Sequence, residues 1–186
     1  LNNITVNSNL NVSAGTLDYG NTVARTITVT GDLSGAGTID MASGGALAHP
    51  LTLNGANNAI GSFVPGSGTV IYSRAGVQQI FAGTYFNLTT QSSNQIRTIQ
   101  GDVIVNNNLT LTQGTFSFGN GAARNVVVNG NLSGAGGIDM SGGALPHSLT
   151  LNGGNNAITN FTAGSGSVIY SGTVGQQIFS GTYYNL

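Results

Sequence analysis

The stretch GSGTVIYSRAGVQQIFAGTYFNL, residues 66–88, shows how this chain is organised, because it occurs twice. Its second copy, GSGSVIYSGTVGQQIFSGTYYNL, occupies residues 164–186. The similarity continues upstream, where residues 4–41 match residues 103–140 and residues 43–65 match residues 141–163. About 52 of about 84 aligned positions are identical, so the chain is a tandem repeat. We assign residues 1–102 to the first repeat unit and residues 103–186 to a second, truncated unit of one continuous structure.

The composition predicts an all-β chain. Only 5% of the 186 residues are charged, and lysine, glutamate, cysteine and tryptophan are absent. Good helix formers are scarce, whereas Thr, Val, Ile, Tyr and Phe alternate with Asn and Gly, as they do in strands and tight turns. A net charge of −1 without a basic cluster argues against nucleic acid as a partner. No run approaches the roughly 18 apolar residues that a membrane span needs.

A shorter period lies within each repeat. Strand-like segments recur at similar intervals from Val6 to Val29 and from Val29 to Leu53. The interval from Leu53 to Tyr72 is shorter, and the later intervals, such as that from Tyr72 to Leu88, are shorter still. About five coils of about 20 residues therefore fill each repeat of about 98 residues. This coil length is typical of a parallel β-solenoid, also called a β-helix.

The alternation within strands predicts which side chains form the core. In TITVT, residues 26–30, Ile27 and Val29 are expected to point inward and the threonines outward. The same pattern in LTL, residues 51–53 and 149–151, predicts that Leu53 and Leu151 are buried. Stacked corners are expected to align asparagines into amide ladders, with these candidates: Asn54, Asn57, Asn58 and Asn129.

A β-sandwich is the alternative fold, because it also has short strands between Gly-rich turns, and one repeat has the length of an immunoglobulin-like domain. However, no acidic or proline-bearing linker separates the two units. Strand character continues instead from Tyr85 through Thr90 to Val103. A sandwich core would also use tryptophan, which is absent. These observations favour the solenoid.

Several segments resemble known repeat motifs. VIYS, QQIF and GTYYNL, at residues 168–171, 176–179 and 181–186, resemble a motif of very large secreted repeat proteins of Bacteroidetes-type bacteria. NLNVSAGTL and NLTLTQGTF, at residues 9–17 and 108–116, are similar to the coil motif of haemagglutinin- and autotransporter-type β-helical adhesins. The resemblance covers nearly the whole chain. It implies an exported, extracellular or cell-surface, right-handed parallel β-helix that serves adhesion or forms a fibre, and it carries over no catalytic residues.

The aspartates are the candidates for catalysis. Asp40 and Asp139 are equivalent, and five coils of about 4.8 Å would place them roughly 24 Å apart. Paired glycosidase carboxylates lie about 5 to 9.5 Å apart. Asp32 shares a coil with Asp40, but Asn131 replaces it in the second copy. We therefore expect the aspartates to accept backbone N–H bonds in turns and the chain not to be an enzyme.

The histidines and two of the arginines also occur as equivalent pairs. His49 and His147 have no second potential ligand nearby, so we expect them at corners or on the surface and expect no metal or other cofactor. Arg25 and Arg124 each follow the same Gly-Asn turn. They are expected to cap a corner or to pair with Asp18 or with a carbonyl group.

Tyrosines offer a possible binding surface. Rings exposed on a flat sheet would stack on sugars, with these candidates: Tyr72, Tyr85, Tyr170, Tyr183 and Tyr184. The other interpretation, which we favour, is that they fill a wide core. Rows of outward threonines would suit ice binding, but TITVT becomes NVVVN, residues 125–129, in the second copy, and this argues against that function.

The sequence predicts a non-catalytic structural segment of an extracellular or cell-surface filament, stalk or giant adhesin. The alternative function is a carbohydrate-binding or polysaccharide-degrading β-helix with surface glycans as partners. Neither end resembles a polar cap, because residues 1–6 begin with strand-like alternation and residues 181–186 stop inside the repeated motif. We therefore expect identical chains or further repeats to stack end to end, at about 4.8 Å per coil.

Overall fold

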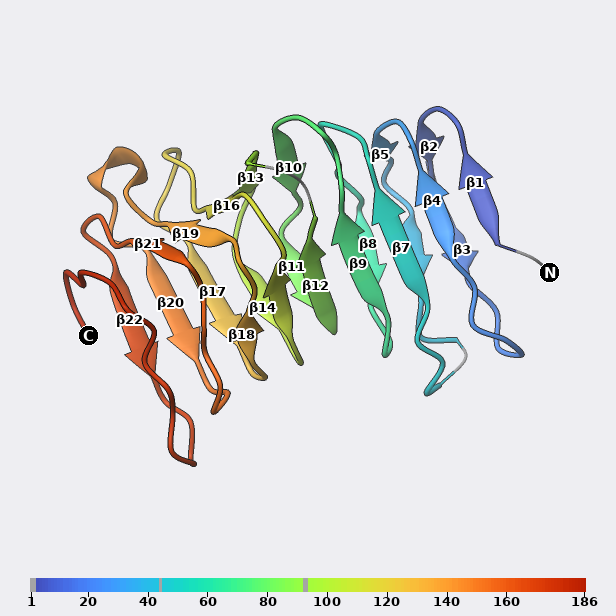
Figure 1. Cartoon of the computed structure of the whole chain (residues 1–186). Coiled ribbons are helices and arrows are strands. Elements are labelled where there is room, and N and C mark those ends of the chain that lie inside the picture. Colours follow the sequence, from blue (N-terminus) through green and yellow to red (C-terminus); the bar gives the residue numbers. More distant parts are fainter. Residues whose placement is uncertain (1–2, 44, 92–93) are drawn as a thin grey trace.

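The chain forms a solenoid in which successive coils lie side by side from the N-terminal to the C-terminal end (Figure 1). The computed structural model describes residues 3–43, 45–91 and 94–186, so Leu1 and Asn2 of the predicted first coil lie outside the described residues. Every strand pair in the described part is parallel, as in the register Ile4 to Ile27. About seven coils with a spacing of about 22 residues confirm the predicted all-β solenoid and exclude the sandwich.

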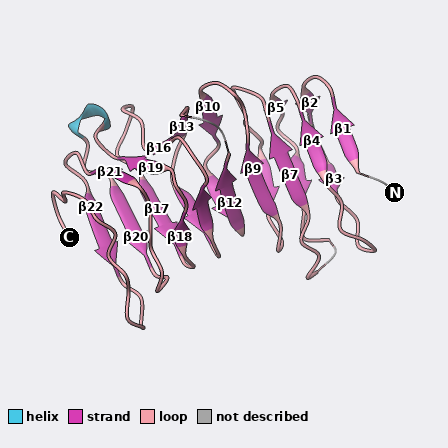
Figure 2. Ribbon diagram, in the orientation of Figure 1, coloured by secondary structure: helices cyan, strands magenta, loops and turns pink. Residues whose placement is uncertain are grey.

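Most coils contribute three short strands, which stack into three faces (Figure 2). Face 1 is one seven-stranded sheet of β1 (Ile4–Val6), β4 (Ile27–Val29), β7 (Pro50–Leu53), β9 (Thr69–Tyr72), β12 (Asn87–Thr90), β15 (Leu109–Leu111) and β18 (Leu132–Ser133). Face 2 holds β2 (Leu10–Asn11), β5 (Leu33–Ser34), β10 (Gln78–Ile80), β13 (Ile96–Ile99), β16 (Thr115–Ser117), β19 (Gly137–Asp139) and β21 (Asn160–Thr162). Face 3 holds β3 (Thr16–Asp18), β6 (Thr38–Asp40), β8 (Ser62–Val64), β11 (Gly83–Tyr85), β14 (Val103–Val105), β17 (Asn125–Val128), β20 (Ser148–Leu151) and β22 (Ser167–Tyr170). One turn of 3-10 helix, η1 (Gly142–Ala144), is the only helix among the described residues.

Face 1 shows directly how the coil length varies along the chain. Its inward residues stack in register from Ile4 to Ile27 and Leu51, at nearly equal intervals. The next two coils, from Leu51 to Val70 and from Val70 to Leu88, are shorter. The last two coils on this face, from Leu88 to Leu109 and from Leu109 to Leu132, are longer again.

The still shorter coil predicted after Tyr72 is wrong. That prediction compared Tyr72 with Leu88, whereas Tyr72 pairs with Thr90, which lies further along the same strand. Thr90 is buried, although threonine is polar. The alternation of apolar side chains therefore does not mark Thr90 as inward.

The core runs through all the coils and follows the predicted alternation. Ile27, Val29, Leu53 and Leu151 are buried, whereas Thr52 between two buried leucines is partly exposed. Stacking brings like apolar residues above one another, so each coil buries the core of the next. The predicted inward register of these strands is confirmed.

The two sequence repeats are not placed on the same faces. β1 of the first repeat lies on face 1, but its counterpart β14 in the second repeat lies on face 3. Because β1 opens the first coil and β14 is the third strand of the fifth coil, one repeat holds four coils and two-thirds of the next. The estimate of about five coils per repeat missed this fraction. The second repeat is therefore turned by a third of a coil about the axis, while face 1 continues from β12 of the first repeat to β15 of the second without a break.

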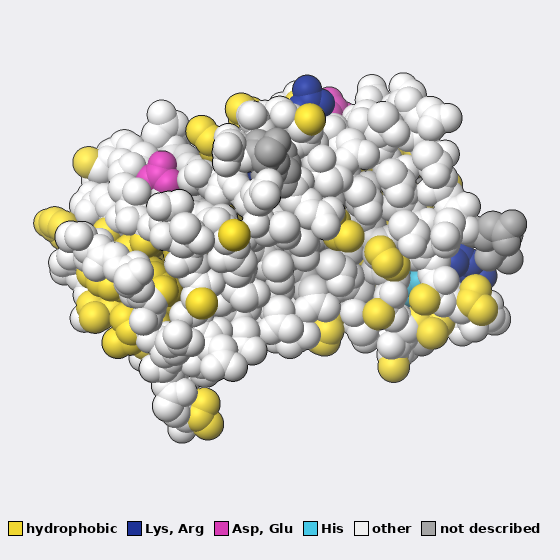
Figure 3. All heavy atoms as spheres, viewed as in Figure 1, with side chains coloured by type: hydrophobic (Ala, Val, Ile, Leu, Met, Phe, Trp, Pro, Cys, Tyr) yellow, Lys and Arg dark blue, Asp and Glu magenta, His cyan; other side chains and the backbone are white. Residues whose placement is uncertain are grey.

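The outer surface carries few charges. On the side shown in Figure 3, charged side chains are few, and apolar side chains gather at the C-terminal end. In the described part of the chain, no helix has the length and apolar character needed to cross a membrane.

Candidate functional site

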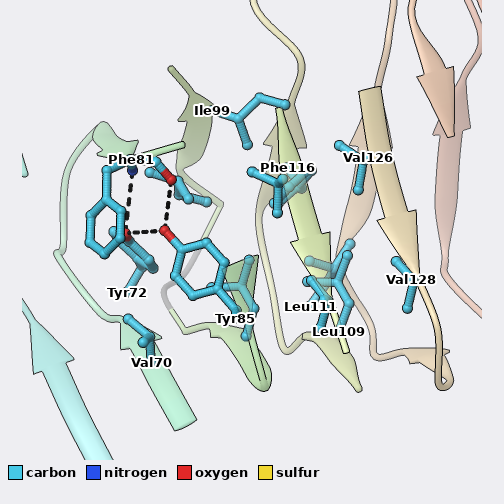
Figure 4. Packing of buried hydrophobic residues seen from close by; sticks show 14 of the residues in the cluster. Val70, Tyr72, Phe81, Tyr85, Ile99, Leu109, Leu111, Phe116, Val126 and Val128 are labelled. Carbon is cyan, nitrogen blue, oxygen red and sulfur yellow. Dashed lines mark hydrogen bonds between the residues drawn. The ribbon is translucent and has the colours of Figure 1, made fainter. Parts of the chain in front are cut away.

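The tyrosines of the repeated motif join two faces across the core. Tyr72 on β9 and Tyr85 on β11 are both 0% exposed, and their hydroxyl oxygens are 3.0 Å apart (Figure 4). The Tyr85 hydroxyl donates to the Phe81 carbonyl oxygen at 2.7 Å, and the Phe81 N–H donates to the Tyr72 hydroxyl at 3.4 Å. Every polar group of this small network has a partner, as burial requires.

This burial contradicts carbohydrate stacking by Tyr72 and Tyr85, because a sugar cannot reach their rings. In the second copy Tyr170 and Tyr183 repeat the contact, with hydroxyl oxygens 3.3 Å apart, but both remain partly exposed in the last coils. Tyr184 is 66% exposed. A stacking role for these last three rings stays a prediction.

The first glutamine of the QQIF motif also acts inside the protein. Gln78 is 0% exposed, and its Nε2 donates at 2.8 Å to the carbonyl oxygens of Leu53 and Gly55 in the preceding coil. Its Oε1 accepts the N–H of Arg74 at 3.3 Å. Gln78 therefore ties a turn to the coil below it. Gln176 makes the same contacts in the second copy, and sequence reasoning did not assign this role to the glutamine.

All five aspartates accept backbone N–H groups, as predicted. The Oδ1 distances to the donor nitrogens lie between 2.5 and 2.9 Å. The pairs are Asp18 with Gly20, Asp32 with Asn57, Asp40 with Ala42, Asp102 with Asn125 and Asp139 with Ser141.

Asp32 belongs to a ladder of side-chain oxygens on one corner. The Asp32 N–H donates to Asn9 Oδ1 at 2.8 Å, and Asp32 Oδ1 accepts the N–H of Asn57 in the next coil at 2.9 Å. In the second copy Asn131 makes the same contact, accepting the N–H of Asn155 at 3.1 Å. This shared contact explains why asparagine replaces aspartate there, because only the acceptor oxygen is needed.

The predicted amide ladders form only in part. Asn152 Nδ2 donates to Asn129 Oδ1 at 2.7 Å, and Asn129 Nδ2 donates to Asn106 Oδ1 at 3.4 Å, so Asn129 is in a ladder. Asn58 is instead buried and its Oδ1 accepts the N–H of Leu33 at 3.1 Å. Several corner asparagines therefore bond to the backbone of a neighbouring coil, which parallel stacking leaves within reach.

We expect Asp32→Asn to change the free energy of unfolding by less than about 0.5 kcal/mol, because asparagine at 131 already performs the same role. Asp32→Ala is the matched control and should cost about 1 kcal/mol, since the N–H of Asn57 loses its acceptor. Urea denaturation of the two variants would measure both values. A large loss in Asp32→Asn would show that the charge itself matters.

One pair of carboxylates that the sequence did not predict lies on face 3. Asp18 and Asp40 are direct partners on adjacent strands. The Gly20 N–H, then the Ser43 hydroxyl and the charge of Arg25, lower the pKa of Asp18. A general acid needs a raised pKa, so Asp18 is a poor proton donor. Asp40 and Asp139, the pair considered from the sequence, lie on different faces.

The histidines are buried, which corrects the expectation of surface positions. His49 and His147 are 0% and 1% exposed, and the Nδ1 of each accepts a backbone N–H, from Arg25 at 3.0 Å and from Arg124 at 3.1 Å. A ring nitrogen that accepts an N–H carries no proton, so Nε2 holds the ring proton. The guanidinium of Arg124 donates to the Phe118 carbonyl oxygen at 2.6 Å, which confirms the predicted corner cap.

An unpaired hydroxyl lies beside one of these histidines. Tyr19 is 2% exposed, its ring meets that of His49 edge-on at 5.2 Å, and its hydroxyl has no hydrogen-bond partner among the described residues. The equivalent residue in the second copy is Phe118, which meets His147 in the same way at 5.3 Å. In both copies the aromatic ring packs against the histidine, and the hydroxyl group of Tyr19 adds no contact.

We expect Tyr19→Phe to stabilise the protein by about 1 kcal/mol or more, because it removes a buried hydroxyl without a partner. The reverse change, Phe118→Tyr, should destabilise it by about 1 to 3 kcal/mol. Thermal and urea unfolding would measure both. The expectation fails if Tyr19→Phe is clearly less stable than the parent protein.

The described residues do not assemble a metal centre, since no three His, Cys, Asp or Glu side chains gather among them. No protein-family model matches the chain, and no curated protein or solved structure matches it either. The aspartates, both histidines and the buried tyrosines Tyr72 and Tyr85 contact the backbone, as described above.

Proposed function

We propose that this chain is a non-catalytic structural segment of an extracellular or cell-surface filament, stalk or adhesin, continued end to end by identical chains or further repeats. The observation that carries the proposal is the continuous core of stacked parallel coils, in which each coil covers the apolar side chains of its neighbour. The same residues that are covered by the next coil in the first copy are uncovered in the second.

The two copies allow this exposure to be compared residue by residue. Ile80 and Leu88 are both 0% exposed, because the next coil places Ile99 over Ile80 and Leu109 over Leu88. Their counterparts are Ile178, 55% exposed, and Leu186, 69% exposed. Figure 3 shows the resulting apolar surface at the C-terminal end. Apolar area of this kind, beside unpaired strand edges, favours association with another coil.

The first coil contains a strand that resembles the one covering this motif inside the chain. Val103 and Val105 of β14 lie in register on Gly83 and Tyr85 of β11. The counterpart of β14 in the first copy is β1, whose Ile4 is 46% exposed. The first coil of a second chain therefore presents the kind of strand that covers this motif inside the chain.

The aspartate contacts support a role without catalysis. Their oxygens hold turns, and the pKa of Asp18 is lowered, whereas a catalytic carboxylate pair has pKa values driven apart. The resemblance to secreted repeat proteins and the scarcity of charge support an extracellular location. The rotation of a third of a coil per repeat also supports a fibre, because equivalent positions such as Thr52 on β7 and Thr150 on β20 then point to different sides.

End-to-end assembly is testable with a lysine at the open end. Light scattering and electron microscopy of the purified chain at rising concentration should show rods of increasing length. Ile178→Lys should prevent this growth, because a buried charge at the junction is costly. Ile104→Lys is the matched control, since Ile104 is 41% exposed on the side of β14, and it should leave growth unchanged.

Two results would contradict the proposal. One is a monomer whose mass is independent of concentration. The other is loss of assembly in Ile104→Lys but not in Ile178→Lys, which would indicate lateral association through face 3.

A further inference from the structure

Two arginines lie together at one corner of the solenoid. Arg97 on β13 is 2% exposed, and Arg74 lies partly exposed in the loop after β9. Arg97 Nη1 donates to the Gly76 carbonyl oxygen at 2.7 Å, and Nη2 donates to the Arg74 carbonyl oxygen. Arg74 Nη1 donates to the Asn54 carbonyl oxygen at 3.3 Å. In the described part of the chain, these guanidinium groups donate to carbonyl oxygens and to no carboxylate.

Neither guanidinium is paired with a carboxylate in the described part of the chain, and only that of Arg97 belongs to a buried residue. Buried charges are normally paired, because transfer from water is costly without an opposite charge. Burial, with a smaller effect from the charge of Arg74, lowers the pKa of Arg97. The Nε atoms of both arginines are buried and have no hydrogen-bond partner among the described residues. The aspartate of the same corner, Asp32, lies between β4 and β5, two coils before Arg74, and accepts the N–H of Asn57.

The surface above the pair is hollowed and offers further donors. The hollow has a volume of about 490 Å³ and is lined by Thr30, Asn54, Ser73, Arg74, Ala75 and Gly76. The carbonyl groups of Arg74 and Gly76 are held by Arg97. The N–H groups of Ala75 and Gly76 donate no hydrogen bond within the described residues. Successive free amides beside a guanidinium are the donors that bind anions in proteins.

We propose that Arg74 and the amides of Ala75 and Gly76 bind an oxyanion group, a sulfate, phosphate or carboxylate, above the buried charge of Arg97. The planar guanidinium of Arg74 keeps donors that its single carbonyl contact does not use. This site goes beyond the structural role, since it supplies the chain with a ligand.

The second copy provides an internal control. Gly172 replaces Arg74, although Gln176 holds that loop in the same way, with its Oε1 accepting the Gly172 N–H at 2.8 Å and its Nε2 donating to the preceding coil. The loop of residues 171–175 therefore shares the glutamine contacts of the first loop but lacks the arginine. It should not bind the anion.

An NMR titration with sodium sulfate tests the proposal, with sodium chloride at matched ionic strength as the reference. The amide signals of Ala75 and Gly76 should shift and saturate, whereas those of Thr173 and Val174 should not. Arg74→Gly, which copies the second loop, should weaken binding at least about tenfold. Arg74→Lys keeps the charge and should bind more tightly than Arg74→Gly.

The same titration with inorganic phosphate, and with dextran sulfate against plain dextran, separates a free ion from an ester group on a polymer. Saturation by any of these probes that disappears in Arg74→Gly supports the site. Equal, unsaturated shifts in both loops, or equal binding by the parent protein and Arg74→Gly, would overturn it. Arg74 is partly exposed, so its variants are expected to fold, and the β signal in circular dichroism checks this.

Discussion

Raising the pH above about 10 is expected to unfold this protein over a narrow pH range. Burial raises the pKa of Tyr19, Tyr72 and Tyr85 well above the usual tyrosine value of about 10. Below that value both the folded and the unfolded chain keep the phenol protons, and the stability is fully present. Above it the unfolded chain releases protons that the folded chain retains, so the free energy of unfolding falls as the pH rises.

The effect is large because three tyrosines act together. Each contributes a loss of about 1.4 kcal/mol per pH unit, so the three remove about 4 kcal/mol per unit from a total that is about 5 to 15 kcal/mol for an ordinary domain. Far-UV circular dichroism and tyrosinate absorbance should therefore change together. Tyr19→Phe is the control and should reduce the slope by about a third. Reversible titration of these tyrosines near pH 10, with the β signal intact, would contradict the expectation.

The sequence was sufficient to predict the fold where the core is purely apolar. Ile27, Val29, Leu51 and Leu53 alternate with outward residues, and their spacing gave the length of the first coils correctly. Prediction failed where a polar residue points inward. Thr90 is 2% exposed but does not differ in the sequence pattern from an outward threonine, so the short coil was measured from the wrong residue.

The fraction of a coil in each repeat was missed for a related reason. Strands such as β2 and β5 are two residues long, and alternation cannot be recognised over two residues. Without these strands the number of faces per coil is undetermined. The register of β1 and β14 on different faces could therefore come only from the three-dimensional pairing.

The candidate site shows the same limit. The aspartate contacts were predictable, because aspartate in a turn commonly accepts a nearby N–H. The burial of His49 was not, since a histidine that accepts one backbone N–H in the core looks like any surface histidine in the sequence. The pairing of Asp18 with Asp40 in the next coil was missed although the first coils have the predicted length, because the strand Thr16–Asp18 was not recognised in the sequence.

Gln78→Ala is expected to destabilise the protein by about 3 kcal/mol. The change removes three hydrogen bonds of the Gln78 amide, each of which contributes about 1 kcal/mol. It leaves the N–H of Arg74 without an acceptor, whereas the carbonyl groups of Leu53 and Gly55 keep the Ser73 N–H and the Asn58 side chain as donors. Water cannot replace the amide, because Gln78 is 0% exposed. Urea unfolding followed by circular dichroism measures the loss.

Two matched variants separate this contribution from a general effect of losing a glutamine. Gln79 follows in the same strand with its side chain partly exposed, and Gln79→Ala should cost less than about 1 kcal/mol. Gln176 repeats the contacts of Gln78 at 2.8 and 2.9 Å but lies partly exposed near the open end. Gln176→Ala should therefore fall between the other two, since water can reach the carbonyl groups that it releases. Equal losses for Gln78→Ala and Gln79→Ala would show that the buried amide does not hold the coils together.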